Sequence, residues 1–361
     1  MKFFLLILIL SFSIVEIGLT ANLDSLKYVN ASDFQLIGKG FAYTQTTYER
    51  LPARLEVKTR PPVWLLSKNC SGLAIRFRTN SRVIAAKWEV TEDIVMNHFA
   101  PSGIKGLDLY CLKNGKWQFV SIARPEKKTT TAIIIDHMAG NDMEYMLYLP
   151  LYDGLVNLEI GVEPKAAISN PKLDTPRKEK PVVFYGTSIT QGGCASRAGM
   201  SYPNQLSRML DRQIINLGFS GNGQLDLEVA EVMTNIDASC FVIDCLGNVT
   251  TTQMNEKYVR FLEIIREKNP NVPILLVENI HFPYMYFDQT IFSMIQEKNA
   301  TLQKIYLSQK KMGDRNIYYM KADKLIGNDF EATVDGVHLT DLGFLRISQN
   351  LYPVIRKLIK K

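Results

Sequence analysis

The chain has 361 residues, a length that at roughly 150 residues per domain suggests two domains. Apolar residues make up 46% of the chain and charged residues 22%, which excludes disordered, collagen-like and coiled-coil classes for its bulk. The net charge of +6 is a mild excess, and no basic run is interleaved with aromatic residues, so nucleic-acid binding is not expected.

The start of the chain differs from the rest. Met1 and Lys2 are followed by an almost wholly apolar run over residues 3–15, which is too short to span a bilayer comfortably. This pattern predicts a signal peptide over residues 1–21 and a periplasmic or secreted protein, with a retained N-terminal anchor as the alternative. No later segment is long and apolar enough to cross a membrane, so no span is expected in the mature chain.

Residues 22–170 carry the pattern of a β-sandwich. Apolar and polar residues alternate, or nearly so, over residues 72–79, 83–90 and 146–152, and turn sequences separate these runs. Short strands with turns at a spacing of roughly 8–12 residues are typical of sandwiches, so we expect a jelly-roll-like β-sandwich domain here.

Residues 171–181 contain three prolines and dense charge, which predicts a linker. Beyond it, short apolar runs alternate with helix-length stretches, which predicts a parallel sheet covered on both faces over residues 182–361. A helix is expected at the end of the chain, with Thr340 as its N-cap. The expected strands cover residues 181–185, 214–218, 240–247, 272–278 and 317–320, and the expected helices 202–210, 225–234, 253–268 and 289–310.

Polar motifs follow several of these strands, where ligands bind in open parallel sheets. Alone, each motif has an ordinary interpretation, such as a serine that caps a helix or an aspartate in a surface turn. Together and in this order they indicate one site. The motifs are Gly186-Thr187-Ser188, Gly218-Phe-Ser-Gly221-Asn-Gly, Leu246-Gly-Asn248 and Asp335-Gly-Val-His338.

This arrangement resembles the SGNH (GDSL-type) hydrolase family. The family's nucleophile block usually reads Gly-Asp-Ser, and here Thr187 replaces the aspartate while Ser188 is kept. The resemblance implies a flavodoxin-like, three-layer α/β/α domain with Ser188 as the nucleophile. His338 would take the serine proton, and Asp335 would orient the histidine and stabilise its charged form.

The same resemblance implies an oxyanion hole built from the Ser188 N–H, the Gly221 N–H and the side-chain amide of Asn248. The aspartate that usually follows the asparagine is replaced by Val249. The elbow sequence of α/β-hydrolases is absent around Ser220, which is therefore read as structural. No cluster of histidines and carboxylates has metal-ligand spacing, so neither a metal nor a cofactor is expected.

A second resemblance lies in the first half of the chain. Gly106-Leu-Asp-Leu-Tyr110 is similar to the Gly-x-Asp-Leu-Tyr signature of a β-sandwich domain that precedes SGNH hydrolase domains, chiefly in Bacteroides-type gut bacteria, and residues 144–152 are also similar. Proteins of this kind are exported hydrolases, and related ones act as carbohydrate or general acetyl esterases.

The resemblances together imply a serine esterase that removes short acyl groups, above all acetyl, from a hydroxylated substrate such as a glycan, through an acyl-Ser188 intermediate. A lipid-acting esterase or lysophospholipase is one alternative, and a non-catalytic carbohydrate-binding protein is another. Small-molecule or glycan esters are the expected partners, and the oligomeric state stays open.

Other residues have weaker expected roles. His98 is a candidate to line the cleft from the sandwich side, His281 is a candidate for substrate contact, and His137 is expected to be packed or at the surface. The tryptophans are expected in the core rather than on a sugar-binding surface; they are Trp64, Trp88 and Trp117.

The five cysteines are an odd number, which does not demand disulfides even on an export route. Cys240 and Cys245 lie in an apolar, strand-like run and are expected to be buried thiols. Cys194 is near Ser188 in sequence, but because Ser188 fills the nucleophile role, Cys194 is expected to serve packing.

Overall fold

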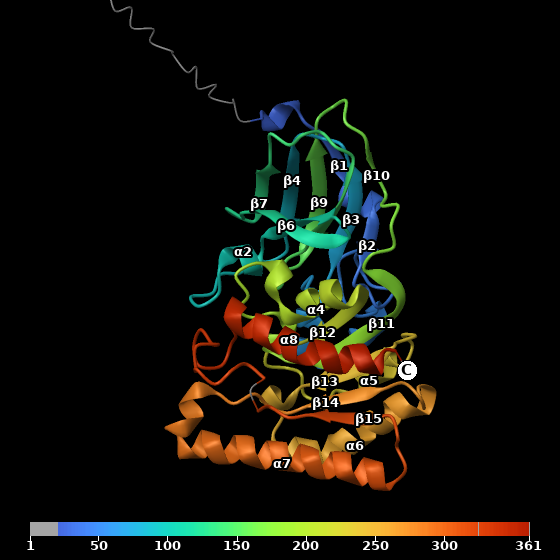
Figure 1. The fold of residues 1–361 in the computed structure, drawn as a ribbon, viewed down its shortest axis with the longest axis vertical. Coiled ribbons are helices and arrows are strands. Elements are labelled where there is room, and N and C mark those ends of the chain that lie inside the picture. The colour runs from blue at the N-terminus through green and yellow to red at the C-terminus, as the bar shows by residue number, and fades with distance from the viewer. Residues whose placement is uncertain (1–20, 324, 361) are drawn as a thin grey trace, which may run out of the picture.

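The structure is a computed structural model that describes residues 21–323 and 325–360. The predicted signal peptide, apart from residue 21, lies outside this range. A β-rich half stands above an α/β half along the long axis of the molecule (Figure 1). Within the described residues, no helix combines the length and the apolar character needed to cross a membrane.

The β-rich half contains two antiparallel sheets with a shared apolar core, in which Phe77 and Trp88 are buried. One sheet has the order β1 (Lys27–Asn30), β9 (Leu155–Val162), β4 (Ile84–Val90), β7 (Thr129–Ile135). The other has the order β10 (Ile168–Ser169), β3 (Ala74–Thr79), β8 (Met143–Tyr148), β5 (Leu107–Lys113), β6 (Lys116–Ala123), with β2 (Gln35–Ile37) also paired to β3. The prediction of a β-sandwich is confirmed.

The other half is built on one parallel sheet with helices on both faces. Its strand order is β12 (Arg212–Gly218), β11 (Arg177–Gly186), β13 (Cys240–Asp244), β14 (Ile274–Val277), β15 (Ile317–Met320). The first two strands are exchanged relative to their order in the chain, as in flavodoxin-like folds, which confirms the predicted architecture. The covering helices are α4 (Tyr202–Leu210), α5 (Leu227–Met233), α6 (Thr251–Lys268), α7 (Gln289–Lys311) and α8 (Asp341–Leu358).

The apolar run of β11 explains why the sheet is covered twice. Side chains alternate between the two faces of a strand. Val182 and Phe184 belong to the core that includes α4 and α8, whereas Val183 and Tyr185 belong to the core that includes α5 and α6. All four side chains are fully buried, so the strand can form only inside a three-layer fold.

The start of β11 lies within the segment 171–181 that the sequence predicts as a linker. The strand begins at Arg177, which pairs with Arg212 of β12, and the register shifts before Val182. Helix α8 begins as predicted, because the Thr340 hydroxyl accepts a hydrogen bond from the Gly343 N–H at 3.3 Å. Pro353 lies within this helix without ending it. The boundaries of the predicted domains stay predictions.

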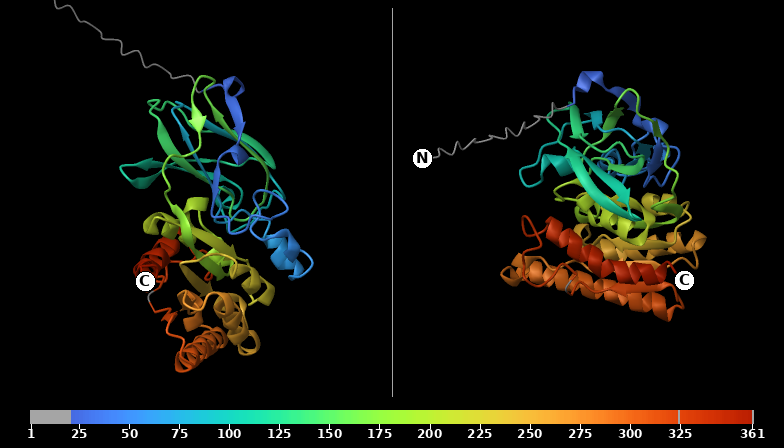
Figure 2. Two further views of the ribbon diagram at one scale, coloured as in Figure 1. Left: turned by 90° about the vertical axis from the view of Figure 1, so that its right-hand side faces the viewer. Right: turned by 45° about the horizontal axis from the view of Figure 1, so that its top comes forward.

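Part of the N-terminal half covers the α/β half. Leu55 of the 3-10 helix η3 (Ala53–Leu55) and Trp64 of helix α1 (Pro61–Leu66) join the apolar core that includes α5 and α6. Arg60 pairs with Asp226 at 2.6 Å. In the left view of Figure 2 the blue segment that contains α1 reaches down beside the α/β half.

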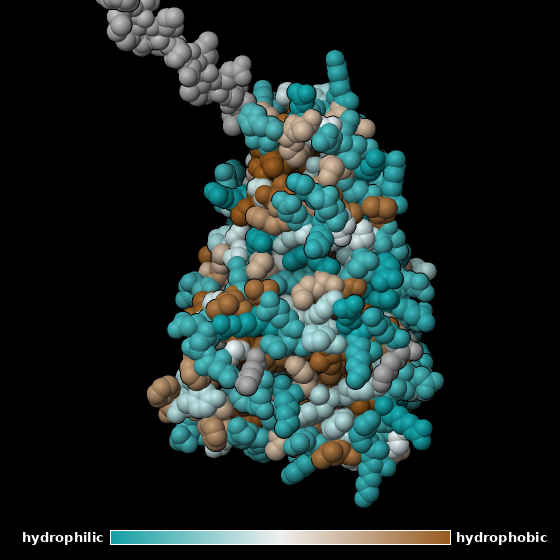
Figure 3. Space-filling view, in the orientation of Figure 1, coloured by the Kyte–Doolittle hydropathy of each residue, from teal (hydrophilic) through white to brown (hydrophobic). Residues whose placement is uncertain are grey.

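The face drawn in Figure 3 is mainly hydrophilic, with small and separate apolar groups.

One buried arginine ties the two halves together. The Arg50 guanidinium donates to the carbonyl groups of Asn69 (2.9 Å) and Leu66 (2.7 Å) in its own half. It also donates to those of Asn216 (3.0 Å) and Gly218 (2.8 Å) at the end of β12. Burial lowers the pKa of Arg50 to about 10, so the side chain stays charged at neutral pH. The buried carbonyl groups of Asn69, Asn216 and Gly218 would lose this donor if the guanidinium were removed, whereas that of Leu66 also accepts from the Asn69 N–H at 3.2 Å.

Replacement of Arg50 by methionine is therefore expected to lower the free energy of unfolding by about 3 kcal/mol, because buried acceptors are left unpaired. Urea unfolding followed by far-UV circular dichroism measures this change. The matched control is Arg260→Met, which removes an exposed arginine paired with Glu263 and Glu267 on α6 and should leave the midpoint unchanged. Equal midpoints for the two variants would contradict the role given to Arg50.

Candidate active site

Ser188 lies where strand β11, between β12 and β13 in the sheet, turns into a short helix. The strand ends at Gly186, Thr187 is the N-cap, and helix α3 spans Ser188–Gln191. The Thr187 hydroxyl accepts a hydrogen bond from the Ile189 N–H at 3.2 Å. As the first helical residue, Ser188 presents its N–H at the helix N-terminus, where amide groups lack partners within the helix. Such an end favours developing negative charge.

His338 reaches Ser188 from the loop that precedes α8, 150 residues further along the chain. Its Nε2 lies 3.0 Å from the Ser188 Oγ, and its Nδ1 lies 2.8 Å from the Asp335 Oδ2. With the proton on Nδ1, the histidine donates to the carboxylate and accepts the serine hydroxyl proton. The three predicted residues therefore form one hydrogen-bonded line.

The spacing of Asp335 and His338 has a local cause. The Asp335 Oδ1 accepts hydrogen bonds from the backbone N–H groups of Val337 (3.0 Å) and His338 (2.7 Å), which folds the turn so that the histidine ring returns to the Oδ2. Partial burial by itself would raise the pKa of Asp335. The hydrogen bonds from the His338 side chain and from these N–H groups outweigh that effect and lower the pKa to about 2. The carboxylate is therefore charged when it orients the histidine.

The two other residues predicted for the oxyanion hole lie in the segments that follow β12 and β13. Gly221 has φ +67°, a backbone conformation that favours glycine, and an added Cβ would meet open space there. Asn248 ends the 3-10 helix η5 (Leu246–Asn248), and its Oδ1 accepts a hydrogen bond from the Gly223 N–H at 3.2 Å. Asn248 and Ser188 line the same pocket, and the hydrogen bond from Gly223 engages the oxygen of the Asn248 amide rather than its Nδ2.

The pocket beside Ser188 is small, with a volume of about 40 Å³. Its walls combine the two asparagines Asn248 and Asn279 with apolar side chains. Drug-sized ligands occupy pockets of roughly 300–1,000 Å³, so this one accepts only a few atoms beyond the ester carbon. The apolar lining comes from Ile189, Ile280, Phe282, Val337 and Ile347.

Cys194 lies in the loop after α3 and is buried. Its backbone N–H donates to the Leu339 carbonyl at 3.4 Å, which joins the nucleophile loop to the loop that carries His338. Burial raises the pKa of its thiol to about 12, and the nearby Asp335 acts in the same direction. A protonated thiol is a poor nucleophile, which agrees with the packing role expected for Cys194. All five cysteines are free.

The sandwich half contributes residues that the sequence did not single out as functional. The Tyr152 hydroxyl donates to the Ser188 carbonyl at 3.0 Å. The Asp108 Oδ2 accepts hydrogen bonds from the Gly199 N–H (2.7 Å) and from Arg197 (2.8 Å), in the loop that follows α3. Both residues lie within the stretches that resemble the sandwich signature, and that position was the available signal. The signature thus serves to hold the loop behind the nucleophile.

The structure separates the other three histidines. His98 lies over the site, with its ring centroid 5.5 Å from that of His338, as expected for a residue lining the cleft from the sandwich side. Ile280 and Phe282 line the pocket beside Ser188, whereas His281 between them lines a separate cavity. His281 therefore faces away from the pocket beside Ser188. His137 is exposed, 3.4 Å from Asp136.

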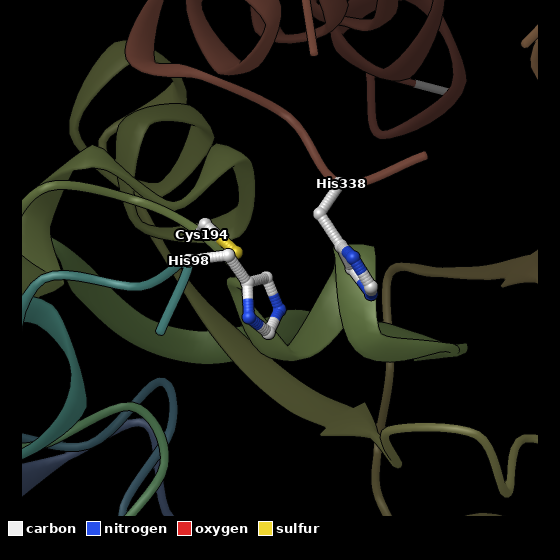
Figure 4. Close-up of side chains that lie close together, drawn as sticks. All are labelled: His98, Cys194 and His338. Atoms are coloured by element: carbon white, nitrogen blue, oxygen red, sulfur yellow. The ribbon is translucent and has the colours of Figure 1, made fainter. Parts of the chain in front are cut away.

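Two of the tryptophans lie in the core, as expected, whereas Trp117 is only half-buried and lines a cavity. Trp64 and Trp88 are buried, and Trp117 is half-buried beneath Arg76. Among the described residues, one group of three side chains could hold a metal ion: His98, Cys194 and His338 (Figure 4). Sequence spacing could not reveal this group because its members come from three distant segments.

Asp244 at the end of β13 also lines the pocket, and the sequence analysis missed it. It accepts a hydrogen bond from the Tyr202 hydroxyl at 2.7 Å. Burial raises its pKa from 3.8 to about 6, although the hydroxyls of Tyr202 and Thr190 oppose the rise. Because this pKa is raised, the protonated Asp244 contributes fully to stability below pH 3.8, and that contribution is lost as the pH rises through about 6.

Replacement of Asp244 by asparagine removes this titration. The unfolding free energy of the variant minus that of the parent is expected to be roughly 2 kcal/mol larger at pH 8 than at pH 4. This follows because one pKa unit corresponds to about 1.4 kcal/mol. Urea unfolding of both proteins at the two pH values measures the change. A difference between variant and parent that does not move with pH would contradict the prediction.

Comparison with known proteins places this geometry in a family. Residues 179–356 match the model of the GDSL-like lipase/acylhydrolase family, and residues 26–168 match that of the N-terminus of SGNH-hydrolase-type esterases. No curated protein matches the chain. A salicylyl-acyltransferase, SsfX3, from a tetracycline biosynthetic pathway has a TM-score of 0.75 at 17% identity, covering 92% of this chain and 98% of that one.

An acetyl xylan esterase from the rumen bacterium Butyrivibrio proteoclasticus has a TM-score of 0.58 at 13% identity, covering 93% of this chain and 99% of that one. At these identities both likenesses concern the fold alone. A candidate GDSL-like lipase from Bacteroides ovatus is 39% identical, with a TM-score of 0.88, covering 93% of this chain and 98% of that one. Two matched halves and a relative similar from end to end show that the chain belongs to the GDSL-like lipase/acylhydrolase (SGNH) family and is a carboxylic ester hydrolase.

Proposed function

We propose that this chain is an exported serine esterase that removes short acyl groups, above all acetyl, from a hydroxylated substrate such as a glycan. The observation that carries the proposal is the hydrogen-bonded line Ser188–His338–Asp335 beside a pocket of about 40 Å³. The line supplies an activated nucleophile, and the size of the pocket favours a short acyl chain. Export is inferred from the signal peptide predicted over residues 1–21.

In the proposed reaction the Ser188 Oγ attacks the ester carbonyl carbon while its proton passes to the His338 Nε2. The carbonyl oxygen becomes an oxyanion that receives hydrogen bonds from the N–H groups of Ser188 and Gly221 and from the Asn248 amide. The carbon–oxygen bond to the alcohol then breaks, and His338 returns its proton to the leaving alkoxide. Water hydrolyses the acyl-Ser188 ester by the same steps, with His338 as its base.

Aromatic side chains extend from the pocket toward the surface, which supports a sugar as the alcohol. Phe282 lines the pocket and stacks on Tyr284 at 5.8 Å between ring centroids. Tyr284 lies in the 3-10 helix η6 (Pro283–Tyr286), against Gly336 of the turn that carries Asp335 and His338. A partly exposed ring offers an apolar face to sugar carbons. The acetyl xylan esterase and other carbohydrate esterases among the similar folds agree with such a substrate.

The first test compares initial rates on p-nitrophenyl acetate, butyrate and octanoate for the parent and for Ser188→Ala. The acetate ester is expected to have at least tenfold higher kcat/KM than the octanoate ester, because the pocket excludes a long chain. Ser188→Ala is expected to lose at least about 10³-fold in kcat. Release of acetate from acetylated xylan then tests the sugar.

Each part of the proposal can fail separately in this test. Preference for octanoate would favour a lipid-acting esterase instead. Equal activity of parent and Ser188→Ala would overturn the assignment of the nucleophile. If both proteins were inactive on all three esters but bound glycan alike, the non-catalytic carbohydrate-binding alternative would replace the esterase.

A second test concerns the oxyanion hole. Asn248→Ala removes the side-chain donor and is expected to lower kcat by roughly 10²–10³-fold while KM changes little, since the lost hydrogen bond strengthens mainly in the transition state. Steady-state kinetics on p-nitrophenyl acetate measure both constants, and circular dichroism checks that the variant is folded. A kcat within threefold of the parent value would exclude Asn248 as an oxyanion donor.

A further inference from the structure

The nitrogen and sulfur atoms of His98, Cys194 and His338 converge over the nucleophile. One ligand atom from each of these residues lies within 4.8 Å of the others. His98 comes from the sandwich half, Cys194 from the loop after α3 and His338 from the loop before α8, and the three side chains meet in Figure 4. The esterase reaction proposed above uses only His338 of the three.

Neighbouring contacts hold the segments that bring these side chains together. The residue after His98, Phe99, is buried and packs edge-on against Tyr152 at 5.0 Å between ring centroids. Tyr152 in turn donates to the Ser188 carbonyl. The loop of Cys194 is bound to the Leu339 carbonyl, one residue beyond His338. The rings of His98 and His338 are tilted by 46° and do not stack face to face, and the His98 Nδ1 lies 3.0 Å from the Asn97 Oδ1.

Two imidazoles and a thiol are the donor set that zinc prefers. Zinc binds nitrogen at about 2.0–2.1 Å and sulfur at about 2.3 Å in tetrahedral geometry, which places ligand atoms about 3.5 Å apart. A modest rotation of the half-exposed His98 ring would close the remaining distance. Thiol and imidazole donors favour zinc over magnesium or calcium, which prefer oxygen.

The hydrogen bond from His338 to Asp335 adds to this fit. Metal-bound histidines commonly donate their other ring N–H to a carboxylate, which fixes the ring and makes the free nitrogen more basic. The Asp335 carboxylate already accepts such a hydrogen bond from the His338 Nδ1, at 2.8 Å. The nitrogen left for a metal is the Nε2, which otherwise accepts the proton of Ser188. A metal ion and the nucleophile therefore compete for the same lone pair.

We propose that His98, Cys194 and His338 form a binding site for a thiophilic divalent cation, tested here as Zn²⁺, and that its occupation blocks the esterase reversibly. The cation is not a cofactor of the reaction. On binding, the thiol releases its proton and all three side chains become ligands, with Ser188 or water free to take the fourth position. The site joins the two halves of the molecule across the active site.

Inhibition by Zn²⁺ is measured with p-nitrophenyl acetate in the parent and in Cys194→Ser and His98→Gln. Each variant is compared with its own metal-free rate, so a change in basal activity does not matter. Loss of one ligand is expected to raise the Zn²⁺ concentration for half-inhibition at least tenfold, because removal of even a second-shell partner costs roughly 10–100-fold in affinity. A chelator should restore the parent rate, and Mg²⁺ should not inhibit.

The matched controls are Cys111→Ser and His137→Gln, which remove a half-buried thiol and an exposed imidazole from the sandwich half. Both should keep the Zn²⁺ sensitivity of the parent. Unchanged sensitivity in Cys194→Ser and His98→Gln would overturn the proposed site. So would an equal loss of sensitivity in the control variants, because it would mean that Zn²⁺ acts elsewhere.

A second measurement does not depend on catalysis. Ser188→Ala retains all three ligands, so titration with Co²⁺ should produce a thiolate-to-cobalt charge-transfer absorption that saturates at one ion per chain. The absorption should persist in Ser188→Ala/Cys111→Ser and disappear in Ser188→Ala/Cys194→Ser. Its absence from Ser188→Ala would overturn the site. Its presence in a protein whose parent form hydrolyses no ester would retain the site and reject the esterase proposal.

Discussion

The hydrogen bond of 3.0 Å between the His338 Nε2 and the Ser188 Oγ is the contact on which the site depends. In the sequence, the strands β12 to β15 and the helices among them separate Ser188 from His338. The hydrogen bond therefore forms only when the parallel sheet is complete. β11 fixes Ser188 because its apolar side chains are buried on both faces. α8 fixes the loop of His338 because its apolar face lies in the same core as α4. Packing therefore sets the position of both reacting groups.

The sandwich half is a second support for the same bond. Asp108, Tyr152 and Arg50 bind backbone groups at the ends of β11 and β12 or in the loop after α3. These contacts are buried, where an unpaired polar group is costly, so the two halves must meet in one arrangement to satisfy them. His98 is brought over the nucleophile as a result. The sandwich half thus supports the nucleophile loop from behind and places His98 beside His338, whereas the residues that line the pocket beside Ser188 come from the α/β half.

The site also contains groups that work against the stability of the fold. Asp244 is a half-buried carboxyl that lines the pocket, with a pKa raised to about 6, and its partners are neutral hydroxyls. Functional sites commonly retain such groups although they cost stability. Asp335 behaves in the opposite way, because several N–H groups donate to it and keep it charged. Two carboxyl groups near one serine therefore differ in pKa through their hydrogen-bond donors and burial.

The sequence by itself determined the elements and the local motifs. Hydropathy periods predicted the strands of both halves, Thr340 marked the start of α8, and the motifs around Ser188, Gly221, Asn248, Asp335 and His338 indicated one site. Each of these signals lies within a few neighbouring residues. Asp335 and His338 are the clearest case, because backbone hydrogen bonds across three residues set their geometry.

Only the tertiary structure decided which distant residues surround that site. The contact of Tyr152 with Ser188, the anchoring of the nucleophile loop by Asp108 and the meeting of His98 with Cys194 join segments whose sequences carry no mutual signal. The small volume of the pocket likewise depends on side chains from several strands, loops and helices. Such features follow from the packing of the whole chain, because the shape of a cavity and the pairing of buried polar groups are properties of all their neighbours at once.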